Sequence, residues 1–392
     1  MSEFHLDFRD TATAFADKSN AELKEKYRLF SLLNSPFLNS LGGRATKFAL
    51  ALGLPVKGLI KRTVFEQFCG GETIRECEPV IASLGDAHIG TILDYSVEGK
   101  ATEADFDHTK DEIIKTIERA KDDPRIPFSV FKVSGIAPLG TLERMSAKKK
   151  LDAKSQAKCE RIHSRVAEIC DYAFSVRQPI FIDAEESWTQ DAVDRLATTM
   201  MERFNREAPI VYNTLQMYRV DRLQFLRESR RRAAAEGYVL GVKLVRGAYM
   251  EKERERAAEM GYESPIHPDK ESTDNDYNAA LDYCMDHIDD VAFVAGTHNE
   301  ISAEHLAERM NKRRVESDNP HIFFSQLYGM GDNLSYVLGK YGYNVSKYVP
   351  YGPVEDAIPY LIRRAEENSS AAGQVSRELE LISSELKRRK LS

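Results

Sequence analysis

Apolar positions along the chain follow two different patterns, and the change between them falls near residue 88. Residues 18–83 place apolar side chains three and four positions apart, which is typical of amphipathic helices. From residue 88 onward, short apolar and β-branched runs alternate with long charged stretches of helical period. The pattern therefore predicts an N-terminal helical arm followed by alternating strands and helices.

The short apolar runs are eight in number, with seven helical segments between them. The predicted strands are residues 89–97, 128–134, 179–184, 210–216, 239–245, 291–297, 322–328 and 346–351. Strict alternation of strand and helix favours a parallel sheet, and eight repeats favour closure into a barrel over an open sheet. We therefore predict an α/β protein built on a (β/α)8 barrel, with an arm at 1–85, the barrel at 86–370 and a C-terminal helix at 371–392.

Composition narrows the class of protein without pointing to a function. The 392 residues carry a net charge of −7, so a basic surface for nucleic acid is not indicated. The five cysteines are odd in number and form no C-x-x-C pair, which argues against a disulfide framework or a zinc site. No metal is predicted. The first residues lack the pattern of a signal or transit peptide, so we expect a cytoplasmic protein whose membrane contact, if any, is peripheral.

Polar side chains stand at the ends of the predicted strands, where buried strands would ordinarily be apolar. In a barrel of this class the loops that follow the strands converge on one mouth, and the chemistry is found there. Any one of these residues could be a cap or a barrel-layer residue, but the whole set favours a functional site. They are Asp94, Lys132, Asp183, Gln216, Lys243, Thr297, His298, Gln326 and Tyr348.

Two adjacent arginines follow the last predicted strand. Pro353 suits the first turn of a helix, which places Arg363 and Arg364 on a helix near the mouth. Paired guanidinium groups offer planar, bidentate donors and would form a clamp for a carboxylate. They could instead be surface residues that complement the helix dipole, but Tyr348 and Tyr360 around them favour the clamp.

Two further segments carry features of phosphate binding. The predicted strand 239–245 contains Lys243 near its end and is followed by Arg246, and Gly247 with Ala248 would let the backbone approach an anion such as a pyrophosphate. A charged, flexible loop is the alternative there. The turn GMGD at 329–332 follows the seventh strand, where barrels commonly hold phosphate, but a lone G-x-G is a weak signal.

Several of these segments together resemble the proline dehydrogenase family. They are LDYSVEG, the Lys132 strand, FIDAEE, KLVRGAY, GTHN at 296–299, QLYGMGD, Y-x-P-x-G from Tyr348, and YLIRRAEEN. They span residues 90–370 and stand in the order of the family.

The resemblance implies a distorted barrel that holds FAD noncovalently and binds L-proline against it. It implies catalytic roles for Lys132, Asp183, Tyr348, Arg363 and Arg364. The arginines would hold the substrate carboxylate, with Glu98 as the ion-pair partner of Arg363, and the residues around the ring would be Lys132, Tyr249, Leu327, Tyr348 and Tyr360. The implied flavin-binding residues are Asp183, Ala184, Gln216, Lys243, Val245, Arg246, Gly247, Ala248, Lys270, Thr297, His298, Asn299, Gln326, Leu327, Glu367 and Ser370.

The same resemblance implies the reaction and its partners. L-proline would be oxidised to 1-pyrroline-5-carboxylate by hydride transfer to flavin N5, and the electrons would pass to a quinone at a membrane surface. The chain carries no aldehyde-dehydrogenase segment, so a separate pyrroline-5-carboxylate dehydrogenase is expected to act next. One departure concerns KLVRGAY, where Lys243 and Arg246 are exchanged relative to some bifunctional bacterial members.

Two alternatives stay open from the residues alone. An aldolase would use Lys132 or Lys243 as a Schiff base and the GMGD turn for phosphate. An interaction protein would use the helical arm and the C-terminal segment, where Leu379, Ile382 and Leu386 share one helical face. That face could equally pack against the rest of the fold.

Overall fold

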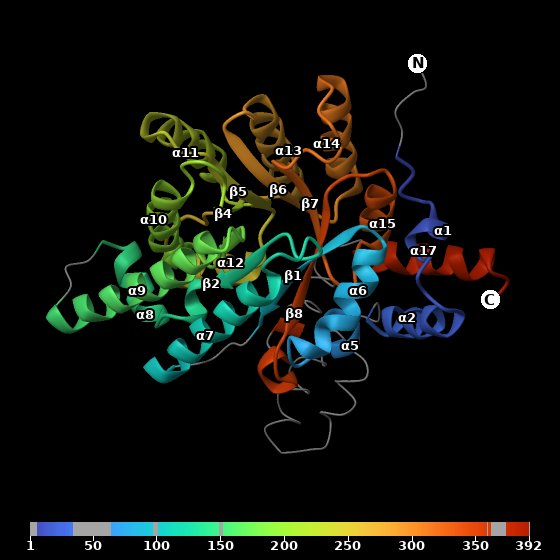
Figure 1. The fold of residues 1–392 in the computed structure, drawn as a ribbon, viewed down its shortest axis with the longest axis horizontal. Helices are drawn as coiled ribbons and strands as arrows, with labels where there is room; N and C mark the ends of the chain where they lie inside the picture. The colour runs from blue at the N-terminus through green and yellow to red at the C-terminus, as the bar shows by residue number, and fades with distance from the viewer. Residues whose placement is uncertain are drawn as a thin grey trace. The chain divides into compact units, whose positions relative to one another are not determined.

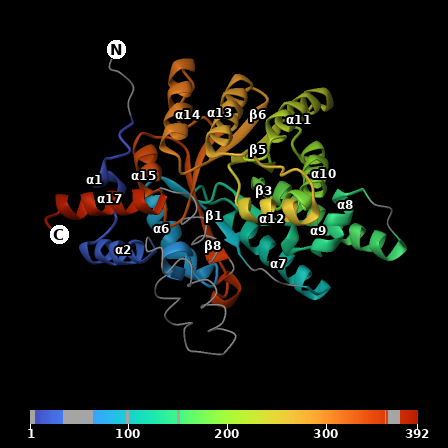
Figure 2. The same ribbon diagram turned by 180° about the vertical axis from the view of Figure 1, so that it is seen from behind.

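The computed structural model describes residues 6–33, 64–96, 101–148, 152–358, 360–361 and 374–391. The chain divides into two compact units, one formed by residues 1–98 and 326–392 and the other by residues 99–325. Figure 1 and, from behind, Figure 2 show the elements of both. Each unit is described by itself below.

All eight predicted strands are confirmed, and each begins within one residue of its predicted start. The strands are β1 (Ile89–Tyr95), β2 (Ser129–Lys132), β3 (Ile180–Asp183), β4 (Val211–Gln216), β5 (Leu240–Val245), β6 (Val291–Gly296), β7 (Ile322–Leu327) and β8 (Val345–Tyr351). They form one sheet in the order β1-β8-β7-β6-β5-β4-β3-β2. Chain order around the sheet, with β1 beside β8, is the order of a (β/α)8 fold, so the predicted fold class is confirmed.

Helices cover the strands of the unit formed by residues 99–325. Figures 1 and 2 show α10, α11, α13 and α14 on the outer side of β4, β5 and β6. The helices are α7 (Glu103–Ala120), α8 (Leu139–Ser146), α9 (Ala153–Ser175), α10 (Ser187–Phe204), α11 (Arg222–Glu236), α12 (Met250–Met260), α13 (Lys270–Asp286) and α14 (Glu300–Arg313), with the short 3-10 helix η3 (Val133–Gly135) after β2.

Local sequence sets the ends of these helices. Thr102 and Asp105 form a capping box at the start of α7, because each side chain accepts a hydrogen bond from the other's backbone. Asp269 accepts from the backbone of Ser272 and caps α13 in the same way. Gly237 ends α11 with a φ of 72°, a left-handed conformation that glycine adopts without strain.

An aromatic cluster fills the amino-terminal ends of the strands in this unit. The ring of Phe128 stacks on Phe181 with centroids 4.5 Å apart. It meets the edges of Tyr212 and Phe323 at 5.4 and 4.8 Å. Each of these residues lies within one residue of the start of its strand, so the aromatic cluster closes the amino-terminal end of the strands. The polar residues of the predicted site lie toward the carboxyl ends of the strands.

The other unit holds the paired strands β1 and β8 and the helices from both ends of the chain. β1 and β8 pair in parallel from Ile89 with Val345 to Tyr95 with Tyr351. Its helices are α1 (Thr11–Ala14), α2 (Asn20–Leu33), α5 (Glu66–Phe68), the 3-10 helix η2 (Arg75–Cys77), α6 (Glu78–Asp86), α15 (Asp332–Lys340) and α17 (Gln374–Arg388). Part of the predicted helical arm, residues 34–63, lies outside the described residues.

The C-terminal helix α17 packs against the N-terminal helices, as Figures 1 and 2 show. Ile382 and Leu386 are buried in a core shared with Phe15, Leu23 and Phe30 of the N-terminal segment. The apolar face of the tail is therefore covered within its own unit, which removes the main support for an interaction protein. No helix in the described ranges has both the length and the apolar character that crossing a bilayer requires.

Candidate active site

Two lysines share one buried carboxylate at the carboxyl ends of β2, β3 and β5. Lys243 donates a short hydrogen bond to Oδ1 of Asp183, and the Nζ of Lys132 lies 3.4 Å from Oδ2. Asp183 is 7% exposed and Lys243 5%. The ammonium group of Lys243 also lies 4.9 Å from the centroid of the Phe181 ring. The structure thus brings together three residues that the sequence predicted for one site.

The Lys132 side chain is the more accessible of the two lysines, at 24% exposure against 6% for Lys243. Asp183 therefore holds a fixed inner cation and a more accessible outer one. The arrangement concentrates positive charge where one carboxylate balances two ammonium groups, which favours a negatively charged ligand or transition state.

A buried glutamate, Glu185, links the ends of β2, β3 and β4. Its carboxylate accepts hydrogen bonds from the backbone N–H of Ser134, at 3.0 Å, and from the Ser134 hydroxyl. Its backbone carbonyl accepts from Nε2 of Gln216 at 2.6 Å. Burial raises the pKa of Glu185 to about 7, although the bonds from Ser134 oppose the shift. Ala184, next to it, is half-buried.

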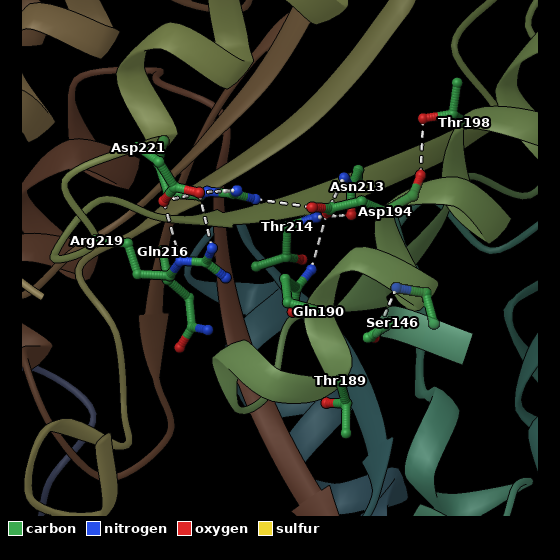
Figure 3. Close-up of polar contacts among 12 residues, drawn as sticks. Ser146, Thr189, Gln190, Asp194, Thr198, Asn213, Thr214, Gln216, Arg219 and Asp221 are labelled. Carbon is green, nitrogen blue, oxygen red and sulfur yellow. Dashed lines mark hydrogen bonds and ion pairs between the residues drawn. The ribbon is translucent and has the colours of Figure 1, made fainter. Parts of the chain in front are cut away.

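A hydrogen-bond network behind Glu185 fixes its backbone and runs to an ion pair between α10 and α11. Figure 3 shows the part of this network that contains Gln190, Asp194 and Asn213. The N–H of Glu185 donates to Oε1 of Gln190 at 3.0 Å. Nε2 of Gln190 and the side-chain amide of Asn213 both donate to Asp194 at 2.9 Å. Arg222 donates to the other oxygen of Asp194 at 2.7 Å, and both residues are buried. This rigid support orients the Gln190 amide and, through Glu185, the Gln216 side chain.

Arg246 follows β5 directly, and three hydrogen-bond acceptors hold its guanidinium group in place. It donates to Asp274 at 2.7 Å, to the hydroxyl of Thr297 at 2.6 Å and to the hydroxyl of Ser302 at 2.9 Å. Lys270 donates to the same carboxylate of Asp274. Burial raises the pKa of Asp274, but the bonds from Lys270 and Arg246 outweigh it, so the pKa is lowered. Two predicted flavin-binding cations are therefore placed side by side.

The loop after β5 needs glycine at residue 247. Gly247 has a φ of 139°, and a Cβ there would lie 2.5 Å from the ring of Tyr218. The backbone of this loop also lies close to the end of β4, because Tyr218 donates its N–H to the carbonyl of Arg246 at 2.7 Å. Val245 and Ala248 are half-buried, and Tyr249 is the N-cap residue of α12.

The predicted residues after β6 begin α14. Asn299 caps this helix, because its side chain accepts a hydrogen bond from the N–H of Ser302 at 3.1 Å. The hydroxyl of Thr297 accepts from the N–H of Asn299 at 3.0 Å as well as from Arg246. His298 is half-exposed between them. Thr297 thus joins the start of α14 to the Arg246 group.

Four further predicted residues lie in the other unit. Oε1 of Gln326 accepts a hydrogen bond from Ser335 at 2.8 Å, and Leu327 is half-buried at the end of β7. Tyr348 and Tyr360 are 8% and 6% exposed. The remaining predicted residues, Glu98, Arg363, Arg364, Glu367 and Ser370, lie outside the described residues, so the carboxylate clamp stays a prediction.

The GMGD turn has the wrong surroundings for phosphate. The N–H of Gly331 donates to the carboxylate of Glu378 at 2.5 Å, and that of Met330 to the carbonyl of Leu327 at 3.3 Å. Asp332 adds a second buried carboxylate at the same turn. Backbone donors that an anion would need are already engaged, which disfavours the aldolase interpretation.

Comparison with known proteins decides the family. The family model described as "Proline dehydrogenase" matches residues 77–377, about three quarters of the chain. The chain belongs to the proline dehydrogenase family. The family predicted from the sequence motifs is thereby confirmed, and so is the expectation of an oxidoreductase family.

Relatives of this family match most of the chain. A proline dehydrogenase described as mitochondrial from Dictyostelium discoideum is 32% identical over 97% of this chain and 74% of its own length. The carbapenem antibiotics biosynthesis protein CarD of Pectobacterium carotovorum subsp. carotovorum is 37% identical over 82% of this chain and 83% of its own.

A solved structure supports the fold. The crystal structure of proline utilization A from Bdellovibrio bacteriovorus, inactivated by N-propargylglycine, matches with a TM-score of 0.73 and 18% identity. The match covers 97% of this chain and 42% of that longer chain. At this identity the likeness shows a shared fold and nothing further.

Sequence reasoning missed several residues that support the predicted site. Glu185 stood inside the FIDAEE segment, and two acidic residues directly after a buried strand were a signal for it. Asp274 lies four residues after Lys270 on one helical face, which was a weaker signal. Gln190 and Asp194 gave no signal, because polar residues in a helix are ordinary until their partners are known.

Proposed function

We propose that this protein oxidises L-proline to 1-pyrroline-5-carboxylate, with FAD as the hydride acceptor and a quinone as the next electron acceptor. Membership of the proline dehydrogenase family carries the proposal, because the match at 77–377 includes every described residue predicted for the site. A separate pyrroline-5-carboxylate dehydrogenase would then act on the product.

The residues in the unit 99–325 fit the chemistry of FAD. Arg246 and Lys270 supply two neighbouring cations for a pyrophosphate, and Gly247 lets the backbone approach closely. Gln216 and the Lys243–Asp183 pair supply polar contacts at the ends of β4, β3 and β5. When bound, FAD supplies an electron acceptor for the hydride at N5.

The chain's own residues would bind and orient the substrate. Arg363 and Arg364 would hold the carboxylate of proline, and Tyr348, Tyr360 and Leu327 would contact its ring. Holding both ends of a small, rigid ring fixes which carbon faces the acceptor, and such orientation lowers the barrier of a bimolecular step. The Lys132–Asp183–Lys243 group would stabilise negative charge that develops near it.

A flavin spectrum of the purified protein tests the proposal. The protein, supplied with FAD if necessary, is expected to show the visible absorbance of an oxidised flavin and to lose it on anaerobic addition of L-proline. D-Proline serves as the control, because a site that fixes both carboxylate and ring accepts one chirality. A protein that stays colourless after FAD is supplied would end the proposal, and an aldolase would behave in that way.

A further inference from the structure

A buried charge cluster holds the turn that follows β7. Lys347, on β8 and fully buried, donates to the backbone carbonyls of Met330 and, at 3.4 Å, Leu327. Its Nζ also lies 2.9 Å from Oδ1 of Asp332. Burial lowers the pKa of Lys347, and the nearby Asp332 carboxylate opposes that shift. One lysine thus ties the end of β7 to β8, next to Tyr348.

The helices from both ends of the chain complete this cluster. Lys26 of α2 lies 2.7 Å from Oδ2 of Asp332, the carboxylate oxygen that Lys347 leaves free. Glu378 of α17 accepts the N–H of Gly331 at 2.5 Å. Lys26 is 7% exposed and Glu378 1%, so both interactions are shielded from water. Buried charges and polar groups of this kind cost several-fold more when unpaired than surface ones.

Close contacts and left-handed glycines restrict the backbone conformation of the turn. Gly329 has a φ of 81°, and a Cβ there would lie 2.0 Å from the backbone oxygen of Gln67. The carbonyl of Gly329 accepts from the Gln67 side chain at 2.6 Å. Gly331 is also left-handed, with a φ of 61°. The turn is therefore set by its tertiary partners, which are Lys347 on β8, Gln67, and Lys26 and Glu378 on the helices α2 and α17.

The turn and Tyr348 are coupled through the backbone. The N–H of Tyr328 donates to the carbonyl of Tyr348 at 2.9 Å, and Leu327 precedes Tyr328 directly. A shift of the turn would move Leu327 and would disturb the backbone position of Tyr348.

We propose that helices α2 and α17 position the substrate-contact residues Leu327 and Tyr348 through this cluster, with Lys26 and Glu378 as positioning residues. The proposal rests on the proposed function for the meaning of Leu327 and Tyr348. It assigns a role in proline binding to two helices that lie almost wholly outside the family match at 77–377.

The kinetic test uses Lys26→Met and Glu378→Leu in the full-length holoenzyme. Each is expected to raise the KM for proline about tenfold and to change kcat less than threefold, because displacements on the order of 1 Å weaken contacts to the bound ring. Lys24→Met is the matched control, since Lys24 is exposed on the same helix, and it should leave both constants within twofold. Unchanged KM in both cluster variants would overturn the proposal.

A second readout separates positioning from a general loss of stability. Hydrogen exchange of the amides at 327–333 should quicken at least tenfold in Glu378→Leu, while amides of β3 and β4 keep their wild-type rates. Glu378→Gln conserves the shape and the acceptor for Gly331, so it should restore both the protection and the KM.

The other possible results of these experiments also support or overturn the proposal. A Glu378→Gln variant as impaired as Glu378→Leu, or quickened exchange with unchanged KM, would overturn the positioning role. If Lys26→Met and Glu378→Leu do not fold, a wild-type KM in Glu378→Gln together with full protection of Gly331 supports the proposal. A wild-type protein that fails to oxidise proline would instead refute the proposed function.

Discussion

Replacing Glu185 by glutamine should change how stability depends on pH. In the folded protein burial raises the pKa of Glu185 from 4.5 to about 7. The folded state then binds a proton more tightly than the unfolded state does, so the free energy of unfolding falls as pH rises from 4.5 to 7. Above pH 7 the loss is complete, and below pH 4.5 it is absent.

The size of the effect follows from the shift. A difference of roughly 2.5 pH units corresponds to about 3 kcal/mol at 1.36 kcal/mol per unit. Glu185 is 5% exposed, so solvent screening takes little from this figure. Glutamine has the same shape, and its amide can still serve Ser134, but it carries no titrating group. The stability of Glu185→Gln relative to wild type should therefore rise by about 3 kcal/mol between pH 4.5 and 8.

Urea unfolding at pH 4.5, 5.5, 6.5 and 8 measures this difference. Using the difference between variant and wild type removes the contribution of every other titrating group. Glu207→Gln is the control, because Glu207 is exposed and its removal takes no charge out of the interior. A Glu185→Gln curve that runs parallel to wild type across this range would refute the reasoning, whatever the absolute stability of the variant.

Two further predictions concern the predicted site directly. Asp183→Asn leaves Lys132 and Lys243 without their shared carboxylate, so it should lower the free energy of unfolding in urea by about 3 to 5 kcal/mol. Asp171→Asn is the control, because Asp171 forms an exposed pair with Arg203, and it should lower the free energy of unfolding by less than about 1 kcal/mol. Equal losses in the two variants would contradict the argument from the buried pair. The wild-type protein should prefer L-proline over trans-4-hydroxy-L-proline by at least about tenfold in kcat/KM. Tyr348→Ser should reduce this preference, because removing the phenol makes room for a ring hydroxyl. An unchanged ratio of the two kcat/KM values would show that Tyr348 does not select the substrate.

The strands could be predicted because each is signalled locally. A run such as IFID at Ile180–Asp183 is apolar on both faces and ends in a charge, and this pattern depends on no distant residue. Helix starts also have a local origin in the structure, as at Asn299, whose side chain caps α14. Parallel strands ending at one mouth then implied which side chains would gather there.

The supporting contacts could not be predicted because they join residues far apart in the chain. Lys26 meets Asp332 across 306 positions, and each would pass as an ordinary surface charge on its own helix. Asp194 resembles any acidic residue of a charged helix until Arg222 and Asn213 are placed beside it. The sequence pattern indicates which face of a helix or strand is buried. These pairs depend instead on which helices and strands become neighbours in the fold.

The presence of lysine at 243 and arginine at 246 has a geometric reason in this chain. Lys243 lies in a narrow, buried position between the carboxylate of Asp183 and the ring of Phe181, which suits a compact ammonium group. Arg246 spreads its guanidinium over three separate acceptors, and a lysine could not reach all of them from one nitrogen. The choice between lysine and arginine at each of these two positions is therefore set by the partners of the side chain.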